Sequence, residues 1–207
     1  MVFSSILLEN AVAEFAKLPG IGKKTALRLV LHLVQQDEIN VAHFSETIAT
    51  MRKNIRFCRR CHNIADADLC NICSNTMRKQ QLLCVVETFR DVIAIESTQQ
   101  FNGVYHVLGG IISPLDGVGP DQLNIETLLQ RVVAEEIEEI IFALNPNIQG
   151  DTTIYYIGKK LKEKPIKITT IARGISFGGE LEFADELTLA KSITNRIPVH
   201  SLISTTG

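Results

Sequence analysis

The chain has 207 residues, of which 45% are hydrophobic and 21% charged, and this balance excludes disordered, collagen-like and small disulfide-stapled proteins. The formal net charge of −2 is unevenly divided: residues 1–80 hold 11 Lys/Arg against 7 Asp/Glu, whereas residues 81–207 hold 10 against 16. No apolar run approaches the roughly 18 residues of a membrane-spanning helix. Because the first residues also lack a basic leader region, we expect a cytoplasmic protein with no membrane partner, whose front part favours an anionic partner.

Residues 1–56 are expected to form a helical domain. Apolar residues recur at three- and four-residue intervals in NAVAEFAKL, TALRLVLHLV and VAHFSETIATM, which is the pattern of amphipathic helices. The first two runs are joined by LPGIGKK, residues 18–24, a short turn with two glycines. Such glycines let the backbone approach a phosphate closely, and the N–H groups that open the second helix carry the positive end of its dipole.

This turn resembles the helix-hairpin-helix motif of DNA-repair proteins, which grips the sugar-phosphate backbone without selecting sequence. Basic side chains follow the glycines and add charge at the same place. The structural alternative is a helix cap followed by a solvated basic turn. The predicted DNA-binding residues are Gly20, Gly22, Lys23, Lys24 and Arg28.

Residues 57–79 contain four of the five cysteines, spaced as two C-x-x-C pairs. Two such pairs supply the four tetrahedral thiolate ligands of a closed structural zinc site, which leaves no open position for catalysis. We expect one structural Zn²⁺ per chain in a small zinc-ribbon-like loop, whereas Cys84 is expected to fill the core. The predicted ligands are Cys58, Cys61, Cys70 and Cys73.

Two charge clusters leave alternatives open. Basic residues flank the first cysteine pair and either extend a phosphate-binding surface or form a solvated face. They are Arg52, Lys53, Arg56, Arg59 and Arg60. The acidic run Glu135, Glu136, Glu138 and Glu139 is expected to be a solvated edge between a helix and a strand.

Residues 80–173 change to a βα alternation. The runs QLLCVVE, EEIIFALN and PIKITTIA predict buried strands, with helical stretches such as IETLLQRVVAEEI between them. A parallel sheet with helices on its faces follows. The predicted fold class is therefore an α+β chain of several parts: helical, zinc-binding, α/β and a C-terminal tail segment of residues 174–207.

The α/β part resembles the Toprim fold of topoisomerases, primases and nucleases. Those enzymes carry a glutamate after the first strand, matching Glu87, and an Asp-x-Asp pair after a later strand. Here that pair is replaced by Asn145 and Asn147. Because neutral amides lack the anionic oxygens that hold Mg²⁺, we expect no enzymatic activity. The alternative is a Toprim-type metal-dependent nuclease or topoisomerase-like enzyme working through the remaining acids, Glu87, Asp91 and Asp151.

The order of the four parts, together with the segment GGELEFADE at 178–186, resembles the RecR family of bacterial recombination mediators over essentially the whole chain. The resemblance implies a non-enzymatic clamp that assembles as a homotetramer, or dimer of dimers, and encircles DNA at gaps or single-strand/double-strand junctions. It also implies action with RecO and RecF to load RecA, in the cytoplasm at the nucleoid, with Glu87, Asp91 and Asp151 as partner contacts. A DNA-free zinc scaffold is the third possibility if the basic residues are idle.

Overall fold

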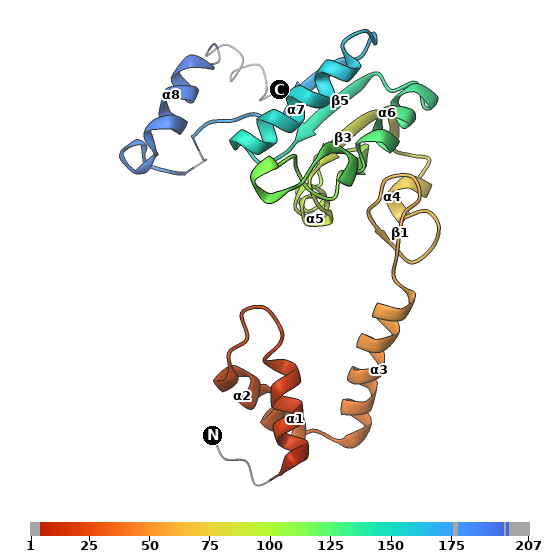
Figure 1. Ribbon diagram of the computed structural model, residues 1–207, viewed down its shortest axis with the longest axis vertical. Helices are drawn as coiled ribbons and strands as arrows, with labels where there is room; N and C mark the ends of the chain where they lie inside the picture. Colours follow the sequence, from red (N-terminus) through yellow and green to blue (C-terminus); the bar gives the residue numbers. More distant parts are fainter. Residues whose placement is uncertain (1–4, 176–177, 197, 199–207) are drawn as a thin grey trace. The chain divides into compact units, whose positions relative to one another are not determined.

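The computed structural model describes residues 5–175, 178–196 and 198, and it separates into two units, Met1–Ile55 and Arg56–Gly207 (Figure 1). Part of the predicted C-terminal segment, namely residues 176–177, 197 and 199–207, lies outside the described residues. None of the helices in the described part is long and apolar enough to cross a membrane.

The first unit consists of three helices, α1 (Ile6–Phe15), α2 (Lys23–Val34) and α3 (Glu38–Asn54). The predicted helical pattern of this region is confirmed. A small core of Val12, Ala26 and Val30 joins α1 to α2. No residue of α3 is buried.

The second unit opens with the cysteine-rich segment, which we call the zinc loop (residues 56–78). Strands β1 (Arg56–Phe57) and β2 (Ile64–Ala65) pair antiparallel, and the short helix α4 (Asn71–Ser74) follows. The four predicted ligand cysteines and Ala65 form the buried centre of this loop.

Four parallel strands form the main sheet, in the order β4-β3-β5-β6. Their bounds are β3 (Lys79–Val86), β4 (Gly103–Val107), β5 (Glu139–Ala143) and β6 (Lys167–Thr170). The α+β fold class and the parallel sheet are confirmed, and the predicted runs correspond to β3, β5 and β6. The prediction that all three are buried is wrong for β6, which lies at an edge of the sheet and is mostly exposed. Strand β4 was missed, because its five residues GVYHV are few and carry a tyrosine and a histidine between the valines.

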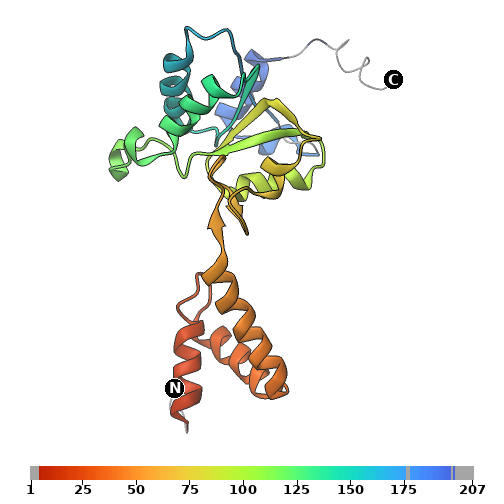
Figure 2. The ribbon, with the colours of Figure 1, turned by 90° about the vertical axis from the view of Figure 1, so that its right-hand side faces the viewer.

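Helices cover both faces of this sheet (Figures 1 and 2). Leu83 and Val85 of β3 pack in the larger core with residues of α6 (Ile125–Ala134) and α7 (Ile148–Leu161). Cys84 and Val86 face the other way and pack with residues of α5 (Phe89–Ser97). This alternation follows from the two-residue period of a strand, and it sets Glu87 at the end of a strand that is buried on both faces.

Strand β4 lies at an edge of the sheet, yet all five of its residues are buried. Side chains from other elements bind its alternate carbonyl groups. Arg78 donates to Gly103 O at 3.0 Å, Arg131 to Tyr105 O at 2.6 Å, and Asn124 to Val107 O at 2.9 Å. The Val107 amide in turn donates to Cys61 O of the zinc loop at 2.8 Å.

The remaining described elements are short. Three 3₁₀ helices span Pro114–Asp116, Pro120–Gln122 and Leu181–Phe183, and the last helix is α8 (Glu186–Thr194), capped by the Asp185 side chain. Arg173, just before the C-terminal segment, forms an ion pair with Asp151 of α7 at 2.6 Å.

Candidate functional site

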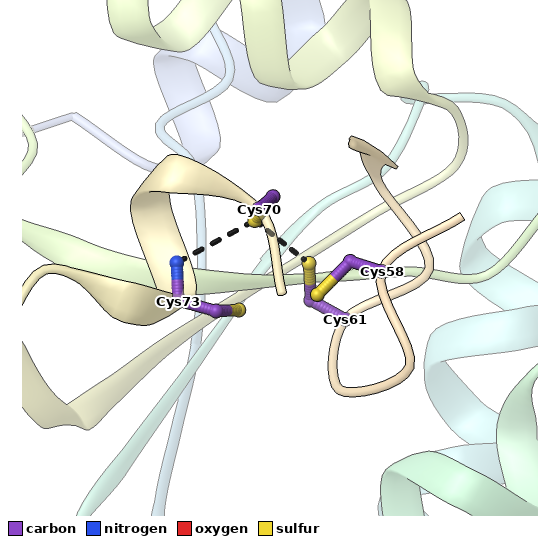
Figure 3. Close-up of side chains that lie close together, drawn as sticks. All are labelled: Cys58, Cys61, Cys70 and Cys73. Atoms are coloured by element: carbon purple, nitrogen blue, oxygen red, sulfur yellow. Dashed lines mark hydrogen bonds between the residues drawn. The ribbon is translucent and has the colours of Figure 1, made fainter. Parts of the chain in front are cut away.

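The four predicted metal ligands come together. Figure 3 shows Cys58 and Cys61, from the β1–β2 turn, facing Cys70 and Cys73 at the start of α4. All four sulfur atoms lie within 4.8 Å of one another, and Cys61 Sγ and Cys70 Sγ are 3.5 Å apart. Zn–S bonds of about 2.3 Å place tetrahedral sulfurs about 3.8 Å apart, so the cluster fits one zinc ion. The four cysteines are thus positioned to bind one metal ion, as predicted.

Local backbone bonds shape each half of this site. The Cys58 amide donates to Asn63 O at 2.7 Å and the His62 amide donates to Cys58 O at 2.8 Å, which closes a tight turn. That turn requires a φ of +61° at His62. On the other side, hydrogen bonds from the Cys61 and Cys73 side chains hold the pKa of the Cys70 thiol well below its usual range. The hydrogen bond with Cys70 raises the pKa of the Cys61 thiol, so in the cluster without metal the Cys70 sulfur is the acceptor.

The fifth cysteine is separate from this cluster. Cys84 is buried in β3 and belongs to the core beneath α5, as predicted. Burial raises the pKa of its thiol to about 12, so it stays protonated at neutral pH.

The zinc loop is fastened to the sheet domain by Arg60. Its guanidinium binds both carboxylate oxygens of Glu135, each at 2.7 Å, and also donates to Gln80 Oε1 at 2.7 Å and Cys73 O at 3.2 Å. One expectation is corrected here, because Glu135 is not on a solvated edge. Of the basic group around the first cysteine pair, Arg60 is not a freely solvated side chain, since its guanidinium is bound within the protein. The two residues are 75 positions apart, and no local pattern in the sequence signals that they meet.

Glu135 also binds Arg131, a residue that the sequence did not single out. Arg131 Nε donates to Glu135 Oε2 at 2.8 Å, and the Arg131 side chain is only 4% exposed. Burial by itself raises the pKa of the Glu135 carboxyl, but the hydrogen bonds and charges of Arg60 and Arg131 outweigh it and lower that pKa. The only sequence signal was the four-residue spacing of Arg131 and Glu135 on a helix.

The glycine turn has the geometry that its sequence predicts. Gly20 adopts a φ of +76°, a conformation that side chains with a Cβ rarely adopt, and Gly22 precedes the first residue of α2. An added Cβ would meet nothing within 4 Å at either glycine, so both face open space. The turn therefore offers bare backbone to a ligand.

The basic residues of the hairpin are exposed. Lys23 and Lys24 occupy the first turn of α2, which contains no acidic residue and has no side-chain cap, and Arg28 lies one turn further on. Positive charges in a first helical turn oppose the helix dipole and lower helix stability by a few tenths of a kcal/mol each. Among the described residues none of the three has an ion-pair partner. These positive charges slightly destabilise α2 in the isolated chain, and the same charges favour the binding of an anion at the start of the helix.

At the carboxyl end of the sheet, Glu87 meets Asn145. The Asn145 amide donates to Glu87 Oε2 at 2.8 Å. Asn147 instead caps α7, because its side-chain oxygen accepts from the Gly150 amide at 2.7 Å. Gly150 is required here, since a Cβ on it would lie 2.1 Å from Asn145 O. Both asparagines thus have structural hydrogen bonds of their own.

The other two acids of this region also have internal partners. Asp91 accepts hydrogen bonds from the Thr88 amide at 2.7 Å and hydroxyl at 3.1 Å, which forms the capping box of α5. Asp151 is paired with Arg173, and that hydrogen bond lowers the pKa of the carboxyl. In the part of the chain that the structure describes, the cysteine cluster is the only group of three or more metal-ligating residues close enough to share an ion. Glu87, Asp91 and Asp151 do not form such a group.

Comparison with known proteins identifies the parts of the chain. Family models match for the RecR helix-hairpin-helix over residues 8–52, the RecR four-cysteine zinc finger domain over 55–75, the Toprim domain over 81–172 and the RecR C-terminal region over 174–197. The matches follow the order of the parts in the structure.

Similar proteins match over nearly their whole length, and each is named "Recombination protein RecR". The protein of Flavobacterium psychrophilum is 58% identical over 198 residues, covering 96% of both chains. That of Bacteroides thetaiotaomicron is 55% identical over 94% of this chain and 95% of its own, and that of Amoebophilus asiaticus is 54% identical over 97% and 100%. A helix-hairpin-helix, a four-cysteine metal centre and a Toprim sheet, in this order and at this level of identity, show that the chain belongs to the RecR family.

Proposed function

We propose that the chain is a DNA-repair recombination mediator that binds DNA as a non-enzymatic clamp and acts with RecO and RecF to help load RecA at single-stranded gaps. The observation that carries the proposal is the hairpin: two exposed glycines followed by three exposed basic residues without ion-pair partners in the described chain. Membership of the RecR family, whose members compared above are named recombination proteins, supports it. In this proposal the protein is cytoplasmic and associated with the nucleoid.

The assigned contacts follow the predicted residues. We propose that Gly20, Gly22, Lys23, Lys24 and Arg28 contact DNA phosphates, independent of base sequence. Glu87, Asp91 and Asp151 remain the predicted partner contacts. Asp151 is the more exposed member of its ion pair with Arg173, because its side chain is 46% exposed and that of Arg173 is 21% exposed.

The absence of catalysis is part of the proposal. The Asn145 amide already occupies Glu87 Oε2, and neither asparagine brings the negative charge that a divalent cation site needs. Asp91 and Asp151 are committed to a helix cap and to an ion pair. These contacts support a docking role for this end of the sheet rather than phosphoryl chemistry.

Assembly as a homotetramer or dimer of dimers is also proposed. The apolar side chains of α3 support it, because Ile39 is 81% exposed and Phe44, Ile48 and Met51 are between 43% and 51% exposed. A second copy of the chain would cover such a surface. The division into domains at 1–56, 57–79, 80–173 and 174–207 stays a prediction.

A single gel experiment tests the clamp against the enzyme. Full-length, zinc-loaded protein is mixed with supercoiled or gapped plasmid, with and without Mg²⁺ or Mn²⁺, and half of each sample is deproteinised before loading. We expect a mobility shift that disappears on deproteinisation and leaves the DNA intact. Metal-dependent nicking or relaxation that Glu87→Gln abolishes would instead establish the Toprim-type enzyme.

The hairpin assignment has its own test. Lys23→Gln and Arg28→Gln should each weaken binding to every DNA sequence and lower the slope of log affinity against log salt by about one. Lys162→Gln removes an exposed lysine at the end of α7 and serves as the matched control. An unchanged slope in both hairpin variants would overturn the assignment. If the wild-type protein bound no DNA at all, the DNA-free zinc scaffold would be the function that remains.

A further inference from the structure

An open hollow of about 590 Å³ lies between the zinc loop and α6. Its polar lining comes from both elements and consists of Arg59, Arg60, Thr127, Gln130, Arg131 and Glu135. The volume is within the range of sites that take small ligands. Neither the hairpin nor the carboxyl end of the sheet contributes to it.

The hollow is electropositive. Three guanidinium groups line it against a single carboxylate, that of Glu135, so two positive charges are in excess. Both Glu135 oxygens are already bound, by Arg60 and Arg131, at 2.7 and 2.8 Å. The carboxylate therefore orients two guanidinium groups and cannot neutralise the third.

Arg131 has an unmet hydrogen-bonding requirement. This side chain is 4% exposed, and two of its nitrogens donate to Tyr105 O at 2.6 Å and to Glu135 Oε2 at 2.8 Å. Its remaining nitrogen, Nη2, is buried and has no hydrogen-bond partner. A buried, charged donor without an acceptor is costly. Because Arg131 lines the hollow, a ligand with an acceptor oxygen that reached Nη2 would satisfy it.

Arg59 adds a second, exposed guanidinium to the lining of the hollow. Its side chain is exposed, and within the described part of the chain it has no hydrogen bond or ion pair, since only its backbone amide is bound, to Asp68 O. Guanidinium groups match the oxygens of a phosphate in two-point contacts. One buried and one exposed guanidinium thus face the same hollow.

We propose that this hollow binds a phosphate group of the nucleic-acid backbone, with Arg131 as the buried donor and Arg59 as the exposed one. The site is separate from the hairpin and provides a second point of attachment on the other unit of the chain. The choice of nucleic acid as the source of the phosphate rests on the proposed function, whereas the affinity for phosphate does not.

The first arm of the test uses inorganic phosphate and does not involve DNA. The thermal stability of full-length, zinc-loaded protein is measured in phosphate and in chloride at equal ionic strength, because a ligand of the folded state raises stability by mass action. We expect a phosphate-specific rise in the wild type and in Arg90→Gln, which removes another exposed arginine, on α5. Arg59→Gln should lose most of that rise. An equal rise in all three proteins would overturn the site.

The second arm measures DNA binding against salt for the same proteins. Arg59→Gln should weaken binding to a gapped duplex about fivefold and lower the salt slope by about one, whereas Arg90→Gln should match the wild type. A phosphate effect without any change in DNA binding would overturn the nucleic-acid assignment. If the wild type bound no DNA at all, the proposed function would fail, while the first arm would still decide whether the phosphate site exists. Arg59 carries the test because Arg131 variants would also disturb β4.

Discussion

The two units of the chain differ in how they are held together. Residues 5–55 bury only Val12, Ala26 and Val30. The unit from Arg56 onward has a hydrophobic cluster on each face of a sheet, four cysteines positioned for one metal ion and a network of partly buried ion pairs. A segment of this size with so small a core is marginally stable on its own. The hairpin that we propose binds DNA therefore belongs to the unit that depends more on contacts beyond itself.

The largest effect should come from the metal. Cys61→Ser removes one of four ligands, and a structural zinc site of this type contributes on the order of 10 kcal/mol when it is complete. We expect the variant to hold less than one zinc per chain and to lose the hydrogen-exchange protection of the zinc loop, while α1 and α2 are unaffected. Cys84→Ala, which leaves all four ligands in place, should retain one zinc per chain. A full zinc content in Cys61→Ser would contradict the four-thiolate site.

The next largest effect should come from the larger core. Phe142 in β5 is fully buried, and Phe142→Ala should lower the free energy of unfolding of the second unit by about 3 to 5 kcal/mol. Tyr155→Ala removes an aromatic ring that is 72% exposed on α7 and should change that free energy by less than about 0.5 kcal/mol. Urea unfolding followed by circular dichroism measures both. Similar losses in the two variants would show that the second unit is less tightly packed than its buried residues indicate.

The ion pairs of Glu135 should make a pH-dependent contribution to the free energy of unfolding. The pKa of Glu135 is lowered in the folded protein, so its stabilising effect is present above its unfolded value of about 4.5 and is lost as the pH falls through the lower, folded value. Glu135→Gln should therefore lower stability by roughly 2 to 3 kcal/mol at neutral pH and by progressively less below about pH 4.5. Chemical unfolding at several pH values tests this, and a difference that stays constant into acid would contradict it.

The smallest expected effect is on amide hydrogen exchange, and it compares the two units directly. If α3 packs against a second copy of the chain, the protection of α1–α3 amides from hydrogen exchange should rise with protein concentration, by about 1 kcal/mol for each tenfold increase. Amides of β3 and β5 should show no such dependence. Phe44→Ser, on the exposed side of α3, should abolish the concentration dependence. Protection of α1–α3 that is independent of concentration would contradict the assembly proposed here.

The sequence predicted the features that depend on local spacing. The two C-x-x-C pairs, the glycine turn and the helical periodicity of residues 5–54 are short-range patterns, and the structure places the cysteines and the turn where those patterns indicated. The apolar runs that became β3 and β5 were recognised for the same reason, since continuous apolar residues indicate a strand buried on both faces.

The features that depend on distant contacts could not be predicted in this way. Strand β4 is buried because the zinc loop, Arg78 and Arg131 cover its edge, and none of these contacts is visible within GVYHV itself. Likewise, Glu135 stood in a run of glutamates that resembles a solvated edge, and only the fold brings Arg60 to it. The pairing of Glu87 with Asn145 spans 58 positions and became visible only once β3 and β5 were neighbours.

The capped edge of β4 has a consequence for the fate of the protein when metal is scarce. An open edge strand pairs readily with strands of other molecules, which is the first step of aggregation. Here the Val107 amide is bound by Cys61, one of the metal-binding cysteines, and Tyr105 O by Arg131, which shares Glu135 with Arg60 of the zinc loop. Loss of zinc would therefore release the Val107 amide and weaken the cover over this buried, apolar edge. We expect the ion to oppose self-association of the wrong kind as well as to shape the loop that holds it.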